Sequence, residues 1–518
     1  MKKTLKFIFS RFTLIALAIV LQLVLWIVLP AYLNYKHPII INNFLVPFNL
    51  IIAVLALLSI LWIINSDIKI EGQLPLIILC ILAPAVGIVF CAIFVKIKLP
   101  RKTKKYLKEA LEQTKNATAL KNETEKTKQP EIEKELGRYL GQFNYIYNTT
   151  NLKSYKNTNV DFYNDGKTFF DSLILELEKA KSFIFMEYFI IEKGQMWNKI
   201  HTILKQKAKE GLDVRLMYDD LGTISRLPSN FYKKLNAEGI KCVKFNEYSQ
   251  FTSSIYNNRD HRKITVIDGR VGFMGGINIA DEYANINCSY GKWKDSAIKL
   301  TGEGVNGLTC IFLQLYGIQS GKIENYTNYF VSHSEKADGI VCPFGDGPKY
   351  FYGEHIGENV YINLISQAQK TIYITTPYLI IDNQLKAALI SASKRGVDVR
   401  IITPHIPDKK AIFKVTRSNY KALQDGGVKI YEFKDGFIHA KQVLVDGELA
   451  IVGTINLDYR SMIHHYECGV LMYKTNCIKD IKADFENLFN ISIDMKDFKQ
   501  SWFAKIFCAL IKLFTPLF

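Results

Sequence analysis

The sequence lacks the cysteine and histidine patterns that organise disulfide-stapled or zinc-binding domains. It has nine cysteines, an odd number, and no Cys-x-x-Cys pair. No histidines have zinc-finger spacing, and the adjacent His464 and His465 point apart on a rigid backbone, which makes a metal site there improbable. We therefore expect buried, reduced thiols, no metal and no cofactor.

Acidic residues are too few to balance the basic ones. The chain has 66 Lys and Arg against 49 Asp and Glu, a formal net charge of +17. This excess favours an anionic partner, which is a nucleic acid, a phosphorylated substrate or an acidic membrane surface. Charge alone does not choose among them, but long apolar segments favour the membrane.

Residues 1–100 form an expected membrane anchor of two to three apolar helices. The apolar runs cover about residues 12–33, 48–64 and 74–95. The first has spanning length, is too long for a signal-peptide core and precedes no small-residue cleavage site. The third contains Pro75, Pro84 and Gly87, which make it the least ideal helix.

Basic residues flank both ends of this anchor. The positive-inside rule places both ends in the cytoplasm, whereas three full spans would separate them. The larger basic cluster, between Lys96 and Lys105, is expected to set the orientation of the anchor in the membrane. We therefore expect the rest of the chain at the cytoplasmic face of the bacterial cell membrane, with one run shallow or re-entrant.

Two polar or amphipathic segments flank the central part of the chain. Residues 101–137 are rich in Lys, Glu, Thr, Asn and Gln, which is typical of a solvated helix or linker. In residues 496–518, apolar side chains recur at helical spacing with lysines near one face. This pattern predicts a basic amphipathic helix that lies at the membrane surface.

The region between these segments is an internal repeat. Residues 181–191 and 370–381 both read as a buried strand after a helical stretch. Each half then alternates strands and helices before it reaches a histidine motif. We expect the α/β class, with two domains of one fold, each a mixed sheet flanked by helices. The domains are expected at 138–330 and 331–495, facing each other as a pseudo-twofold pair.

Each half carries a His-x-Lys-x4-Asp motif followed by a Gly-rich turn and an Asn. Alternate residues of an extended strand point to one side, so the His and Lys project together. The glycines let backbone approach a ligand closely, and the Asn amide can bind a phosphate or the motif strand. Two copies at corresponding places of a repeat indicate catalysis rather than chance. The residues are His261, Lys263, Asp268 and Asn278 in the first copy, and His439, Lys441, Asp446 and Asn456 in the second.

The residue types predict phosphoryl-group chemistry without a metal. One neutral imidazole can attack phosphorus and form a covalent phospho-histidine. The other can protonate the departing alkoxide and then accept a proton from the incoming alcohol. Lys263 and Lys441 supply positive charge to the phosphate oxygens.

Acidic residues complete the predicted site. Asp295 and Glu467 occupy equivalent places in the repeat and are expected to orient His261 and His439. The motif acids, although counted with the catalytic motif, are expected to brace a turn rather than touch substrate. The remaining histidines lack such company and are expected to be ordinary surface or core residues; among these are His201, His333, His355 and His405.

At this point the sequence resembles the phospholipase D superfamily, whose members build one active site from two such motifs. The stretches Tyr188-Phe-Ile-Ile, 218–222, 261–283 and 455–461, together with the apolar ends of the chain, resemble bacterial cardiolipin synthases. The resemblance covers about residue 138 to the C-terminus. One departure is Thr454, where Ser is more usual in the family, although both carry a hydroxyl.

The resemblance implies that two phosphatidylglycerol molecules are joined into cardiolipin with release of glycerol. It makes His261 the phosphatidyl-carrying nucleophile and His439 the acid and base. Phosphatidylglycerol and anionic membrane lipids are the expected partners, and no nucleic acid is expected.

Four alternatives remain open at this stage. A hydrolytic phospholipase D, another phosphatidyltransferase or a nuclease of the superfamily would use the same motifs, because acceptor choice depends on pocket shape and exclusion of water. The membrane segments argue against a nuclease. A non-enzymatic membrane scaffold is disfavoured because His and Lys are intact in both motifs.

Overall fold

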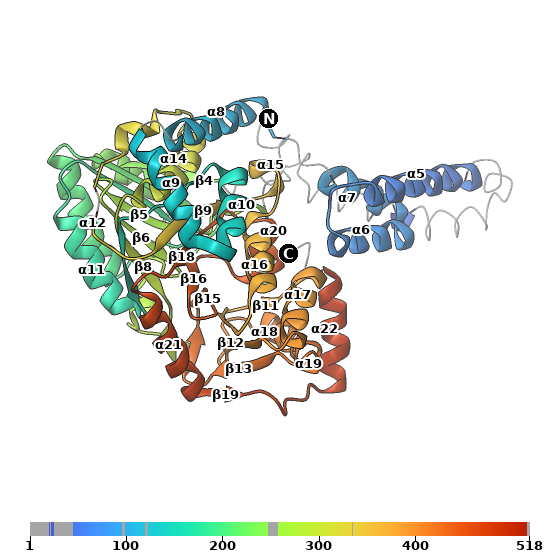
Figure 1. The fold of residues 1–518 in the computed structure, drawn as a ribbon. Coiled ribbons are helices and arrows are strands. Elements are labelled where there is room, and N and C mark those ends of the chain that lie inside the picture. The colour runs from blue at the N-terminus through green and yellow to red at the C-terminus, as the bar shows by residue number, and fades with distance from the viewer. Residues whose placement is uncertain are drawn as a thin grey trace. The chain divides into compact units, whose positions relative to one another are not determined.

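The computed structural model describes residues 20, 22–24, 45–95, 99–119, 123–246, 257–333 and 335–514 (Figure 1). The chain separates into two compact units. The larger unit comprises residues 101–247 and 258–508, and the first hundred residues belong to the smaller one.

Two mixed sheets with the same strand order form the larger unit. The first runs β1-β8-β6-β5-β2-β3-β4. The second, read from β9, runs β9-β18-β16-β15-β10-β12-β13 and adds β19 at its far edge. Corresponding strands therefore occupy corresponding places, and the prediction of an α/β chain with two domains of one fold is confirmed.

The strand bounds place both histidine motifs at the start of a central strand. The first sheet consists of β1 (Thr158–Tyr163), β2 (Phe183–Tyr188), β3 (Asp213–Asp219), β4 (Lys241–Phe245), β5 (Lys263–Ile267), β6 (Val271–Gly275) and β8 (Ala297–Gly302). The second consists of β9 (Ile340–Asp346), β10 (Thr371–Thr375), β12 (Asp398–Pro404), β13 (Lys429–Phe433), β15 (Gln442–Val445), β16 (Leu449–Gly453), β18 (Glu467–Tyr473) and β19 (Ser492–Asp494).

Short strands add two smaller pairings. Strand β7 (Lys292–Lys294) of the first half pairs in parallel with β14 (Gly436–Ile438) of the second. Strand β11 (Leu379–Ile380) pairs with β17 (Leu457–Asp458). The β7–β14 pair joins the halves by backbone hydrogen bonds, so the two domains meet at a fixed register.

Helices cover the sheets because their apolar faces must be buried (Figure 1). Helix α14 is buried along most of its length and contacts both the first sheet and β9, as expected of a helix that is apolar on all sides. The helices of the larger unit are α8 (Arg101–Thr118), α9 (Glu123–Leu136), η3 (Gly137–Tyr139), α10 (Leu140–Thr150), α11 (Gly166–Glu178), α12 (Gln195–Lys209), α13 (Phe231–Ala237), η5 (Asp281–Ala284), α14 (Val305–Ser320), η6 (Tyr326–Tyr329), α15 (Lys349–Tyr352), α16 (Ile356–Gln367), α17 (Asn383–Lys394), α18 (Lys410–Arg417), α19 (Tyr420–Asp425), α20 (Tyr459–Ile463), α21 (Ile478–Ile491) and, largely, α22 (Trp502–Phe514).

Helix α8 corresponds to one of the two alternatives predicted for residues 101–137, a helix rather than a linker, but it is not solvated on every side. The helix forms, but Leu107 and Ala110 are buried. Gln314 of α14 donates a hydrogen bond of 2.8 Å to the Thr114 hydroxyl. Lysines on the outer face dominate the composition and hide this narrow buried stripe, so α8 belongs to the folded enzyme.

The smaller unit contains one helix of spanning length and a hairpin of two shorter ones. Helix α5 (Val46–Ile64) is, among the described residues, the one helix long and apolar enough to cross a membrane. The run at 74–95 is broken at Ala83, where φ is −144°, and gives α6 (Ile70–Leu82) and α7 (Pro84–Phe94). Pro84 begins α7 because proline suits the first helical turn and cannot continue α6. Each piece is shorter than the hydrocarbon core, so this run is not one spanning helix.

Two predictions remain, the apolar run at 12–33 and the C-terminal amphipathic helix. The run at 12–33 lies almost entirely outside the described residues. Helix α22 forms at the C-terminal end, with its Cys508 thiol 3.3 Å from the Lys414 carbonyl of α18. Its opposite side leaves Trp502 and Phe503 exposed, at 66% and 79%.

Candidate active site

Each His–Lys motif lies where a loop enters a central strand. The Lys263 ammonium donates a hydrogen bond of 2.5 Å to the His261 carbonyl, and Lys441 makes the same contact with the His439 carbonyl. All four residues are buried. Each lysine thus closes its own loop and holds its charge beside the imidazole.

The two histidines exchange carboxylate partners between the halves. His261 Nδ1 lies 2.9 Å from Glu467 Oε2, and His439 Nδ1 lies 2.7 Å from Asp295 Oδ2. The two acids are those that the repeat singled out, and the structure shows that each contacts the histidine of the other half. Because the halves face each other, an acid at the equivalent place in each half lies across from the histidine of the other.

Backbone bonds fix this crossed arrangement. The His261 N–H donates to the Tyr466 carbonyl at 2.9 Å, and the His439 N–H donates to the Lys294 carbonyl at 2.7 Å. Each acceptor directly precedes the carboxylate that holds the same histidine. The main chain therefore sets the register that brings ring and carboxylate together.

Two hydroxyl groups donate to the carboxylate oxygens of Glu467 that His261 Nδ1 also contacts. Thr454 Oγ1 donates to Oε2 at 2.5 Å, and Ser461 Oγ donates to Oε1 at 2.6 Å. The carboxylate of Glu467 is itself fully buried, so these donors replace the water that it loses. Sequence reasoning noted the Thr454 hydroxyl but passed over Ser461, which carries no motif signal of its own.

Asp295 is held by backbone and by an indole. The Ser296 N–H donates to Oδ1 at 2.8 Å, and Trp293 Nε1 lies 3.5 Å from Oδ2. A Cβ at Gly276 would lie 2.1 Å from Oδ1 of Asp295. The glycine after the first motif therefore makes room for the protein's own carboxylate, not for a ligand as predicted.

Burial and positive charge together keep both imidazoles neutral. Burial lowers the pKa of His261 well below its usual value, and Lys263, Lys441 and His439 lower it further. For His439, burial and then Lys441 lower the pKa to about 4, against the opposing effect of Asp295. Groups from both halves act on each other, so the motifs form a single site.

The lysines and Asp295 respond to the same surroundings. Burial lowers the pKa of Lys263 to about 8 and that of Lys441 to about 7, although nearby carboxylates oppose the shift. Burial acts to raise the pKa of Asp295, but His439 and Lys441 outweigh it and the net shift is downward. Asp295 therefore stays ionised beside His439, whereas Lys263 and Lys441 lose their positive charge as the pH becomes alkaline.

Aromatic rings enclose His439. The ring centroids of Trp293, Tyr283 and Phe437 lie 5.3, 5.6 and 6.0 Å from that of the imidazole. These rings limit the positions that the imidazole can take and exclude water from its surroundings. A sequence pattern alone does not distinguish aromatic residues that line the active site from aromatic residues of the core.

His465 lies beside His261, although sequence reasoning set it aside. The two ring centroids are 5.6 Å apart, and His465 Nδ1 is 3.7 Å from Glu467 Oε1. Both ring nitrogens of His465 are buried and have no hydrogen-bond partner in the described part of the chain. Ligand-type atoms of His261, His465 and Glu467 all lie within 4.8 Å of one another. The signal that could have found His465 is its place two residues before Glu467, at the entry to β18.

The motif acids and Asn278 brace the backbone. The Asp268 carboxylate accepts from the N–H groups of residues 181, 182 and 183, at 2.8, 2.7 and 2.9 Å. Asp446 accepts from three consecutive N–H groups, those of residues 369–371, and from Arg138. Asn278 accepts from the Ile190 N–H at 2.9 Å. The structure thus gives Asp268 and Asp446 no catalytic contact, and Asn278 supports the end of β2.

The Asn456 side chain differs from its counterpart in the first half. Its carbonyl oxygen is buried and has no hydrogen-bond partner among the described residues, while its backbone N–H donates to Ser461 Oγ at 2.9 Å. This side-chain carbonyl oxygen can only accept a hydrogen bond, so Asn456 suits a headgroup hydroxyl rather than a phosphate oxygen. Three of the predicted ordinary histidines lie in ion pairs of their own: His201 with Glu238, His333 with Glu335 and His405 with Glu432.

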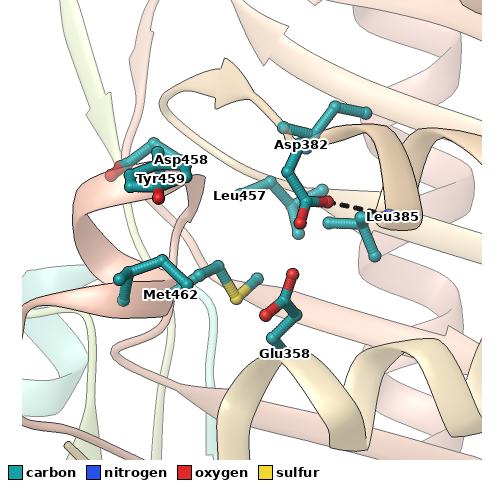
Figure 2. Close-up of a pocket in the computed structure, with 9 residues that line it drawn as sticks. Glu358, Asp382, Leu385, Leu457, Asp458, Tyr459 and Met462 are labelled. Atoms are coloured by element: carbon teal, nitrogen blue, oxygen red, sulfur yellow. Dashed lines mark hydrogen bonds between the residues drawn. The ribbon is translucent and has the colours of Figure 1, made fainter. Parts of the chain in front are cut away.

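A narrow pocket beside α20 carries three carboxyl groups, those of Glu358, Asp382 and Asp458 (Figure 2). Asp382 accepts from the Leu385 N–H and begins α17, and Asp458 accepts from the Ser461 N–H and begins α20, both at 2.9 Å. These acids act as helix N-caps. Capping α20 holds Ser461 in reach of Glu467, so this pocket supports the active site without providing it.

The chain is similar in sequence and in fold to known proteins. A family model described as "Cardiolipin synthase, PLD-like domain" matches residues 173–297 and 361–489. A cardiolipin synthase of Halalkalibacterium halodurans is 32% identical over 442 residues, which cover 84% of this chain and 86% of that protein. An uncharacterized protein of Streptococcus mutans is 45% identical over 378 residues, covering 72% and 81%. Among solved structures, phosphatidylserine synthase from Haemophilus influenzae matches with a TM-score of 0.55 at 16% identity, covering 73% of this chain and 98% of that one.

Two domains with this topology and paired His–Lys motifs define a phospholipase D-like enzyme. The solved structure supports the fold, and the family model covers both halves of the repeat. The chain belongs to the cardiolipin synthase family. The prediction of a phosphatidyltransferase of the phospholipase D type is confirmed at this level.

Proposed function

We propose that this chain makes cardiolipin from two phosphatidylglycerol molecules and releases glycerol. One observation carries the proposal: each of two lysine-flanked imidazoles has its Nδ1 within hydrogen-bond distance of a buried carboxylate. A neutral imidazole that donates its Nδ1 hydrogen keeps a lone pair on Nε2. Two such rings in one site suit a double displacement at phosphorus, in which one ring carries the group and the other moves protons.

In the first step, His261 Nε2 attacks the phosphorus of one phosphatidylglycerol. The bond from phosphorus to the glycerol headgroup breaks, and protonated His439 gives its proton to the departing oxygen. The bound phosphodiester adds negative charge beside His439, which favours its protonated form. Lys263 and Lys441 face the developing charge on the phosphate oxygens and stabilise it.

The second step reverses the roles at His439. The ring is now neutral and accepts a proton from the glycerol hydroxyl of the second phosphatidylglycerol. That oxygen attacks phosphorus, the bond to His261 breaks, and the products are cardiolipin and free enzyme. Aromatic rings around His439 support this acceptor step, because they disfavour water as the competing nucleophile.

His261 suits the covalent role because the hydrogen bonds that hold its carboxylate partner are shorter than those that hold Asp295. Glu467 receives two hydroxyl hydrogen bonds besides the contact with the ring. A phosphorylated imidazole carries positive charge, and a carboxylate fixed in place stabilises that charge without reorganising. We therefore assign the nucleophile to His261 of the first half, whose carboxylate partner Glu467 comes from the second half.

The substrate lies in the membrane, and the chain carries features that fit this surface. Helix α5 has spanning length, and the net charge of +17 favours anionic lipids. We extend the proposal to an enzyme anchored in the bacterial cell membrane with its catalytic domains in the cytoplasm.

The test is a product assay on the full chain reconstituted in phosphatidylglycerol liposomes, with lipids resolved by mass spectrometry. We expect cardiolipin and glycerol in equal amounts, both lost in His261→Ala and in His439→Ala. His201→Ala serves as the matched control, because His201 pairs with Glu238 outside the site. Phosphatidic acid without cardiolipin would instead mean hydrolysis, and no turnover would overturn the lipid assignment.

A further inference from the structure

We propose that His261, His465 and Glu467 form a binding site for a divalent cation of the zinc type, and that the ion inhibits the enzyme. Their ligand atoms all lie within 4.8 Å of one another. Two imidazoles and one carboxylate are a donor set that zinc prefers, whereas magnesium and calcium require mainly oxygen donors. The ion takes no part in the reaction proposed above, although it would bind His261 and Glu467 of the same site.

The spacing of the three side chains fits a tetrahedral ion. Donor atoms about 2.0–2.1 Å from zinc lie about 3.3 Å from each other. The separations measured to one oxygen, Glu467 Oε1, bracket this value, at 3.0 Å from His261 Nδ1 and 3.7 Å from His465 Nδ1. The ligand atoms of all three side chains lie within 4.8 Å of one another.

The state of His465 is the second observation in favour of the site. Its side chain is only 12% exposed, yet neither ring nitrogen has a hydrogen-bond partner among the described residues. Burying polar atoms without partners costs free energy, which a bound ion would offset. Thr454 and Ser461 already donate hydrogen bonds to the two carboxylate oxygens of Glu467, as outer partners of metal ligands commonly do.

Positive charge in the site limits the affinity. Lys263 and Lys441 act on His261 electrostatically and would repel a dication. We therefore expect binding weaker than that of a structural zinc site and readily reversed by a chelator. Such binding suits a regulatory or inhibitory ion rather than a resident one.

Inhibition follows from the tautomer of His261 and rests on its proposed role as nucleophile. An ion on Nδ1 takes the place of the hydrogen there, and that proton moves to Nε2 of the same ring. No proton is gained or lost overall, but Nε2 then has no lone pair with which to attack phosphorus. The ion also joins a residue of the first half to two of the second, so it should stabilise the folded enzyme.

Binding is tested first without reference to activity. Zinc is titrated into the purified, chelator-stripped full chain in detergent, in competition with a chromophoric chelator, and Tm is measured in parallel. We expect one zinc per chain and a rise in Tm, with no effect of magnesium. His465→Phe and His465→Asn should each weaken binding at least tenfold, whereas His464→Ala and His439→Ala should retain it. Unchanged binding in both His465 variants, or no binding by the wild type, overturns the site.

Activity then separates this inference from the proposed function. Zinc should inhibit cardiolipin formation by the wild type and His464→Ala at similar concentrations, with recovery on chelation, and a tenfold higher concentration should be needed for a His465 variant that remains active. Equal inhibition of that variant and the wild type overturns the inhibitory role. Zinc binding that depends on His465 in a protein that makes no cardiolipin would leave the metal site standing and overturn the proposed function.

Discussion

His439 and Asp295 lie 2.7 Å apart, from Nδ1 to Oδ2, although they belong to different halves of the repeat. The contact between His261 and Glu467 crosses in the opposite direction. Each half therefore supplies a histidine for one pair and the carboxylate for the other. A substitution of one carboxylate should therefore impair the histidine of the opposite half. The two pairs can thus be tested separately by experiment.

The crossed pairs predict different defects in the two chemical steps. With phosphatidyl-p-nitrophenol, whose leaving group needs no proton, the wild type should release a burst of nitrophenol as His261 is loaded. Glu467→Gln should slow this burst about 10²- to 10⁴-fold, because His261 loses its orienting anion. Asp295→Asn should leave the burst nearly intact and lower steady-state turnover. Stopped-flow absorbance measures both phases.

The same assay assigns the histidines. His439→Ala should keep the burst and accumulate a phosphatidyl adduct on His261, detectable by peptide mass spectrometry. His261→Ala should show no burst. A burst in His261→Ala with an adduct on His439 would exchange the two roles.

The lysines predict a loss of activity at alkaline pH. Burial lowers the pKa of Lys441 to about 7 and that of Lys263 to about 8. As pH rises through these values each ammonium loses its charge, so kcat/KM should fall from about pH 7 upward. His261 stays neutral well into the acid range because its pKa is lowered, so no matching acid loss is expected near neutrality.

Lys441→Arg tests the cause of this alkaline limb. Arginine keeps its charge across the range, so the variant should lose the fall that begins near pH 7, even where its maximum is lower. Profiles of kcat/KM measured in mixed micelles give the comparison. A fall near pH 8 should remain in this variant, because Lys263 still loses its charge there. A fall that still begins near pH 7 would assign that titration to a group other than Lys441.

Asp268 should matter for stability more than for chemistry. Its carboxylate accepts three backbone hydrogen bonds, and its φ of +52° is strained for alanine. Asp268→Ala should lower the free energy of unfolding by about 2–3 kcal/mol. Differential scanning fluorimetry should show a lower Tm, with kcat per folded molecule within about threefold of the wild type. Loss of kcat at unchanged Tm would instead place Asp268 in the chemistry.

Helix α22 should insert its exposed face into anionic membranes. Phe503 is 79% exposed, and basic Lys505 and Lys512 lie on the same helix. A bimane label at Phe503→Cys should be quenched by doxyl-labelled lipids in phosphatidylglycerol nanodiscs. A label at Lys167→Cys on α11, which lies on the far side of the larger unit in Figure 1, should not be quenched. Equal quenching at both positions, or at neither, would contradict the prediction.

Periodicity and the repeat predicted the architecture because each half had to bury the same pattern of strands and helices. The motif histidines and lysines, and the two acids, followed from the alignment of the halves. Which acid meets which histidine did not, since that depends on how two domains face each other, and no local pattern records it. His465 was missed for a similar reason, because its neighbour His261 belongs to the other half.

Local composition was least informative where an element has two different faces or an unusual break. The buried stripe of α8 is outweighed by the lysines of its outer face. The break at Ala83 depends on how Pro84 ends one helix and begins the next, within a run that is apolar throughout. In both cases packing decided an outcome that residue counts left open.

The crossing of the carboxylates also bears on how such a chain can change over time. Were one half to pair with a second copy of itself, both contacts would be encoded by the same two residues and would have to vary together. In the fused chain four separate positions encode them, and one pair now uses Asp295 while the other uses Glu467. Fusion thus frees each histidine to acquire its own partner and its own role, which a symmetric dimer of identical halves could not permit.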